Sequence, residues 1–198
     1  MSRRALALSI VLAGLTAAIM SAGAAPTRAD ALSLQKKIAG INEFSAQPTP
    51  QSRRTMVTEN EVNAYLTYDV GDQLPSGVVE PGITIVGGGR VSARAVVDLD
   101  AVRKQRPRGL LDPMSYVSGR VPMTATGVLR ASNGVGHLEL EMAAVGPVPI
   151  PKVVLQEIVS YYSRTADKPS GIGLDDPFPL PARIREIQVE AGHAIVVQ

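Results

Sequence analysis

Two stretches decide the fold: LPSGVVEPGITIVGGGRVSARAVVDLD, residues 74–100, and LPARIREIQVEAGHAIVVQ, residues 180–198. Each begins with Leu-Pro, runs into alternating aliphatic residues, turns at glycine and returns as a second aliphatic run. Alternation with a period of two is typical of a half-buried antiparallel strand. Asn133-Gly134, between two further aliphatic runs, is a strong two-residue turn signal because both positions tolerate positive φ. The sequence therefore predicts three β-hairpins.

Two amphipathic helices are predicted, one before the first hairpin and one before the last. Thr58 followed by Glu61 forms a capping box, and the apolar spacing after it predicts a helix over 59–73. The segment KVVLQEIVSYYSR predicts a second helix with a broad apolar face, and Pro151 suits its first turn. Residues 32–44 predict a short helix that a polar, proline-bearing linker ends. Helices segregated from antiparallel hairpins indicate a single α+β domain, either as two related helix-plus-hairpin halves or without an internal repeat.

The N-terminal residues resemble a secretory leader. Arg3 and Arg4 precede an apolar run over 5–20 and then small residues, and Ala29-Asp30-Ala31 fits a cleavage site. We therefore expect a signal peptide over 1–31, a short helix and linker over 32–54, and the main domain over 55–198. An uncleaved anchor helix is the alternative. Cleavage would place the protein in the periplasm or outside the cell.

Composition excludes several functional classes. The chain has no cysteine, so it has no disulfide, no thiolate nucleophile and no acylated cysteine anchor. Its formal charge of +2 is small, and the leader accounts for it because Arg3, Arg4 and Arg28 there oppose only Asp30. There is no Trp and there are only two Phe. Without a basic excess or stacking aromatics, a nucleic-acid binder is excluded.

Candidate catalytic and metal-binding residues are few. His137 and Glu139 share one strand face, but a zinc site needs three or four ligands. Asp98 and Asp100 supply fewer oxygens than a hard cation takes. The turn Gly87–Gly89 lacks the Lys-Ser/Thr of a phosphate-binding loop, and there is no Gly-x-Ser-x-Gly motif. We expect no catalytic centre, metal or cofactor.

A cluster of basic residues follows the first hairpin in a segment expected to be a loop, at Arg103, Lys104, Arg106 and Arg108. Such a cluster can contact anionic lipid headgroups, each charge contributing about 1 kcal/mol near the surface. A solvated loop is the alternative.

Short segments resemble a known family. VTENEVNAYL, residues 57–66, followed by a Leu-Pro hairpin, resembles the opening of the YceB-like envelope proteins. PVPIPKVVLQEIVSYY, residues 147–162, followed by the hairpin over 180–198, is similar to their later half and to the actinobacterial LmeA-like proteins. Both groups look like small members of the tubular lipid-binding (TULIP) superfamily. The resemblance covers most of residues 55–198.

The resemblance implies a strongly bent antiparallel sheet wrapped around two amphipathic helices, with an acyl chain held between them. By that implication the apolar faces of the two helices line the groove: Val62, Tyr65, Leu66, Val70, Val154, Leu155, Ile158, Tyr161 and Tyr162. YceB-like proteins are typically anchored through a cysteine, which this chain lacks, so membrane attachment is not carried over.

Three hypotheses about function follow. The first is an exported, non-enzymatic protein, such as a periplasmic carrier, that binds a lipid or another hydrophobic molecule. The alternative is an envelope scaffold or assembly factor with a closed core that acts through surface contacts with proteins. The third, an envelope hydrolase or glycan-binding enzyme, requires a role for His137 or for Asp98 and Asp100.

Overall fold

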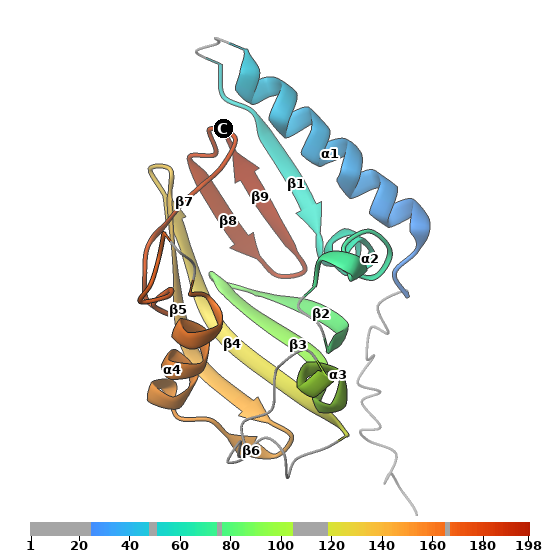
Figure 1. Cartoon of the computed structure of the whole chain (residues 1–198). Helices are drawn as coiled ribbons and strands as arrows, with labels where there is room; N and C mark the ends of the chain where they lie inside the picture. The colour runs from blue at the N-terminus through green and yellow to red at the C-terminus, as the bar shows by residue number, and fades with distance from the viewer. Residues whose placement is uncertain (1–24, 48–50, 75–76, 105–118, 165–166) are drawn as a thin grey trace, which may run out of the picture.

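The computed structural model describes residues 25–47, 51–74, 77–104, 119–164 and 167–198 (Figure 1). Within these ranges the chain is α+β, as predicted, with four α-helices and one antiparallel sheet of nine strands. The strand order is β1-β9-β8-β4-β3-β2, and β5 pairs with β4, β6 and β7.

The helices are α1 (Arg28–Ala46), α2 (Glu59–Tyr68), α3 (Leu99–Lys104) and α4 (Lys152–Tyr162), with a 3₁₀ turn η1 (Gly71–Gln73). The strands are β1 (Arg54–Thr58), β2 (Val78–Gly87), β3 (Arg90–Asp98), β4 (Arg120–Ser132), β5 (Val135–Val145), β6 (Val148–Pro149), β7 (Phe178–Pro179), β8 (Glu186–Glu190) and β9 (His193–Val197).

All three predicted hairpins are confirmed, as β2–β3, β4–β5 and β8–β9. Asn133 and Gly134 turn with φ of 53° and 79°, which explains the Asn-Gly pair. The two Leu-Pro hairpins meet at their turns. The Gly192 N–H donates to the Ile85 carbonyl at 2.8 Å, and the Gly89 N–H donates to the Val189 carbonyl at 3.2 Å.

Gly87 makes this close approach feasible. Its φ is 102°, and a Cβ there would lie 2.9 Å from the main-chain nitrogen of Ala191. A side chain would therefore clash with the backbone of the other hairpin. The triple glycine thus serves both the turn and the contact that joins one hairpin to the other.

The predicted helix boundaries are wrong in two places. The helix expected over 59–73 ends at Tyr68, and η1 follows it. The short helix expected over 32–44 is α1, which begins at Arg28 and is capped by Thr27 through a capping box with Asp30. Ala31 is 1% exposed within α1. The expected cut after Ala31 would thus fall inside this helix.

A buried carboxylate joins α1 to α2. Glu61 is only 6% exposed. It accepts hydrogen bonds from the Ser33 hydroxyl at 2.6 Å, the Lys37 ammonium at 2.7 Å and the Thr58 main-chain N–H at 2.8 Å. Burial alone would raise the pKa of Glu61, but the bonds from Lys37, Ser33 and Thr58 together lower it below its ordinary value.

Side chains of α2 form hydrogen bonds with the backbone of β2, the strand at one end of the sheet. The Asn63 amide donates to the Ile83 carbonyl at 2.8 Å and accepts from the Ile83 N–H at 2.7 Å. Glu59 accepts from the Ile85 N–H at 2.7 Å. Because β2 ends the strand order, these bonds occupy polar backbone groups that an open edge would leave unpaired.

Removing the Glu61 charge should destabilise the fold. We expect Glu61→Gln to lower the free energy of unfolding by about 2 kcal/mol, below the 3–5 kcal/mol typical of broken buried pairs. A smaller loss of free energy is expected because the Lys37 side chain is 29% exposed and stays partly hydrated. Urea denaturation measures this. Glu43→Gln, an exposed change on α1, is the matched control and should have no effect of this size.

The same interaction predicts a pH dependence. Since folding lowers the pKa of Glu61 from its ordinary 4.5, its stabilisation is complete above that value and is lost as the pH falls through the folded pKa. The stability difference between the wild type and Glu61→Gln should therefore be constant near neutrality and shrink in acid. Urea midpoints of both proteins between about pH 3 and pH 7 test this. A difference that grows in acid would contradict it.

The first turn of α1 should contribute to stability. A chain beginning at Leu32 lacks Thr27, Asp30 and the buried Ala31, whereas a chain beginning at Ala25 keeps them. We expect the shorter chain to be less stable by about 1–2 kcal/mol, the usual size of an N-cap contribution. Thermal unfolding of the two chains compares them directly. Equal midpoints would show that the first turn is dispensable.

Candidate functional site

One face of the four strands β2–β5 is aliphatic throughout. Residues paired directly across antiparallel strands project on the same side, so the register assigns each side chain to a face. This apolar face comprises Ile83, Ile85, Val91, Ala93, Ala95, Val97, Val121, Met123, Ala125, Leu129, Ala131, Leu138, Leu140, Ala143 and Val145.

The opposite face carries most of the polar residues: Thr84, Arg90, Ser92, Arg94, Thr124, Thr126, Arg130, His137 and Glu139. Arg90 also binds Glu141 with two hydrogen bonds of 2.8 Å, and this bonding lowers the pKa of the Glu141 carboxyl. The sheet is therefore amphipathic, with solvated ion pairs on the polar face.

The apolar face is only partly covered. Among its side chains only Ile85, Ala131 and Ala143 are buried; Leu138 is exposed, and the rest are half-buried. Across the described residues, no large side chain is fully buried. Aliphatic surface of this extent normally packs out of water in a soluble domain. Here much of it keeps contact with solvent.

The centre of the apolar face is built from small residues. Ala93 pairs with Ala125, and Ala125 pairs with Ala143, which makes a row of alanines across β3, β4 and β5. Ile83 on β2 continues the row at one end. Ala93 and Ala125 are half-buried in this row, whereas Ala143 is only 4% exposed. Alternation along the strands predicted Ala93 and Ala125, but for β5 it placed Met142 beside Leu138 and Leu140. That assignment is wrong, because the register shift between Thr126 and Gly127 brings Ala143 to this face and Met142 to the other.

The structure places the predicted groove residues on two separate helices. Val62, Tyr65, Leu66 and Val70 are half-buried on and just after α2, which contacts α1, β1 and β2. On α4, which contacts β5, Val154 is exposed and Leu155 is half-buried. The side chains of Ile158, Tyr161 and Tyr162 lie outside the described residues. The two groups thus stand beside opposite ends of the β2–β5 row, with β3 and β4 between them (Figure 1).

The loop after α4 is held against it by polar contacts. Gln156 accepts from the Leu174 N–H at 2.7 Å, and Lys152 pairs with Asp175 at 2.7 Å. Despite this cover, Val153 is 74% exposed. The helix thus keeps an unpacked apolar side.

The basic cluster is only partly described. Arg103 and Lys104 are the last two residues of α3, so the loop expected there is wrong for these two positions. Their side chains, and the whole of Arg106 and Arg108, lie outside the described residues. Contact of this cluster with anionic lipid stays a prediction.

The candidate catalytic residues have structural roles. Asp98 accepts from the N–H groups of Asp100 and Ala101, both at 3.0 Å, and so caps α3. Asp100 accepts from the Gly119 N–H at 3.0 Å. His137 lies opposite Arg130 on the polar face. No group of three potential metal ligands occurs in the part of the chain that the structure describes.

Comparison with protein-family models and with curated protein sequences finds no match. The likeness to the tubular lipid-binding proteins therefore stays a prediction from the sequence. Among the described helices, none combines the length and apolar character needed to cross a membrane.

Proposed function

We propose that the chain is an exported, non-enzymatic protein that binds the acyl chain of a lipid, or a similar hydrophobic molecule, on the apolar face of β2–β5. The row of Ala93, Ala125 and Ala143 is the observation that carries the proposal. Small side chains in the middle of an aliphatic, half-exposed face are suited to a bulky apolar ligand lying over them.

The placement of the helices supports this site. Since α2 stands beside β2 and α4 beside β5, a ligand lying over β3 and β4 would have an apolar helix on either side. Such a site would resemble the groove of the tubular lipid-binding proteins, with the sheet as its floor. Each methylene transferred from water to such a site contributes about 0.8 kcal/mol, so a partly covered chain can bind usefully.

The first experiment is organic-solvent extraction of the natively purified protein, followed by mass spectrometry. The proposal predicts a lipid in near-stoichiometric amount, or its uptake after incubation with envelope lipids. An empty extract in both cases would favour the alternative, a scaffold that acts through protein contacts.

Two methionines provide a matched test of the face. Met123 lies on the apolar face, and Met142, paired with Thr126, lies on the polar face. Glutamine has nearly the shape of methionine but places an amide in the apolar site. We expect Met123→Gln to weaken binding of a fluorescent fatty acid about tenfold, from the cost of burying an unpaired amide.

Met142→Gln should leave the same binding curve unchanged, because that side chain is 64% exposed on the other face. Thermal unfolding of both variants verifies that they fold. Equal loss of binding in the two variants would contradict a site on the apolar face.

A further inference from the structure

The first turn of α1 belongs to the folded domain and lies beside α2 (Figure 1). Ala31 is 1% exposed. The Arg28 guanidinium lies 5.6 Å from the centre of the Tyr68 ring at the end of α2, and the Tyr68 hydroxyl donates to the Pro26 carbonyl at 3.5 Å. Residues 26–31 therefore pack as part of the domain and not as a tail that precedes it.

Hydrogen bonds between Thr27 and Asp30 build the start of this helix. The Thr27 hydroxyl and the Thr27 N–H both donate to the Asp30 carboxylate, at 2.6 and 2.9 Å, and the Asp30 N–H donates back to the Thr27 hydroxyl at 3.2 Å. Such bonds occupy N–H groups that a helix start otherwise leaves unpaired. Asp30 is also the middle residue of Ala29-Asp30-Ala31, so the cleavage motif expected from the sequence is part of the helix cap.

A cut after Ala31 would divide this structure. It would remove Thr27 and Asp30, which form the cap, together with the buried Ala31 side chain. The new chain would begin with the charged amino group of Leu32, next to Ser33, whose hydroxyl donates to the buried Glu61 carboxylate at 2.6 Å. The product would thus lack part of the domain that it has to form.

A second small-residue motif stands before the helix, at Ala22-Gly23-Ala24. In a secretory leader the cleavage site follows the apolar run, and here that run ends at Met20. Ala24 stands close behind Met20, whereas Ala31 stands seven residues further along the chain. A cut after Ala24 leaves the whole cap of α1 in the product.

Pro26 distinguishes the two bonds on either side of Ala25. A cut after Ala25 would place Pro26 directly after the bond that breaks. There its ring fixes φ and its nitrogen carries no hydrogen, so it donates no hydrogen bond to a peptidase that holds its substrate as an extended strand. A cut after Ala24 instead places Ala25 at this position and moves the proline one residue away.

We propose that a signal peptidase hydrolyses the peptide bond between Ala24 and Ala25, so that the exported chain begins with Ala25. This inference rests on the export proposed above. As the C–N bond breaks, one water molecule supplies a hydroxyl to the carbonyl carbon of Ala24 and a hydrogen to the nitrogen of Ala25. Ala25 is exposed, so the new amino group stands in solvent ahead of the helix cap.

The first test is expression of the full chain, residues 1–198, in a bacterial host, followed by intact-mass measurement and N-terminal sequencing. The proposal predicts an exported protein whose sequence reads Ala-Pro-Thr-Arg-Ala-Asp. A chain that begins at Leu32, or at any other residue, would overturn the proposed bond while leaving export in place. An uncleaved chain in the envelope would overturn the cut alone, and an uncleaved chain in the cytoplasm would overturn the proposed export as well.

The second test compares the two motifs. Replacing both small residues of the first one, Ala22→Gln with Ala24→Gln, should make the precursor accumulate, because the cleavage site requires small residues there. Ala29→Gln is the matched control. It disrupts the second motif at an exposed position of α1 and should be processed like the wild type, to the same first residue. Pulse-chase labelling measures the processing. Normal processing of the double variant, or accumulation of the Ala29→Gln precursor, would contradict the proposal.

Both tests are independent of any ligand. Lipid extraction and fatty-acid binding examine the apolar face of β2–β5 separately, so a wrong cleavage site and a failure to bind lipid are recognised as different results.

Discussion

The Glu61 carboxylate is the contact on which the arrangement of the sheet edge depends. It accepts from Ser33 and Lys37 of α1 while capping α2 through Thr58, so one side chain joins two helices. A buried carboxylate without these donors would be strongly unfavourable. Once α2 is fixed, Glu59 and Asn63 reach the backbone of β2 and occupy the edge. Specific polar contacts thus hold a region in which few large apolar side chains are buried.

Because these polar contacts stabilise the fold, the aliphatic face of the sheet can remain partly exposed. The fold is secured by hydrogen-bonded hairpins, by the contact between the glycine turn and β8, and by the α1–α2 carboxylate, rather than by one densely packed core. A ligand that covers the apolar face would add the missing apolar contacts to the folded state alone. Such a ligand stabilises the protein by mass action, because the unfolded chain offers no equivalent surface.

The parts predicted from the sequence are those with local signals. Alternating aliphatics and Asn133-Gly134 specify hairpins within about a dozen residues, and Thr58 with Glu61 specifies a helix start. The strands β1, β6 and β7 escaped prediction because they are short, and β1 and β7 also pair with segments that are distant in the sequence. At the candidate site, periodicity predicted the apolar helix faces. It could not align Ala93, Ala125 and Ala143, because their alignment depends on the register of three strands.

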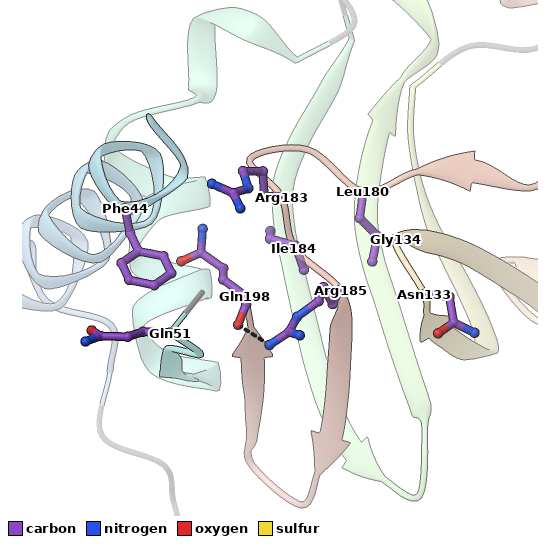
Figure 2. Close-up of a pocket in the computed structure, with 9 residues that line it drawn as sticks. All are labelled: Phe44, Gln51, Asn133, Gly134, Leu180, Arg183, Ile184, Arg185 and Gln198. Carbon is purple, nitrogen blue, oxygen red and sulfur yellow. Dashed lines mark hydrogen bonds between the residues drawn. The ribbon is translucent and has the colours of Figure 1, made fainter. Parts of the chain in front are cut away.

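A cavity whose lining includes Phe44, Asn133, Leu180 and Arg183 illustrates the same limit more strongly (Figure 2). Its groups come from α1, the β4–β5 turn and the two ends of the last hairpin, so no local pattern joins them. Apolar burial is non-directional and tolerates many chain lengths and shapes. A ligand on the apolar face of β2–β5 would therefore be selected by the extent of its apolar surface and not by particular hydrogen-bonding groups.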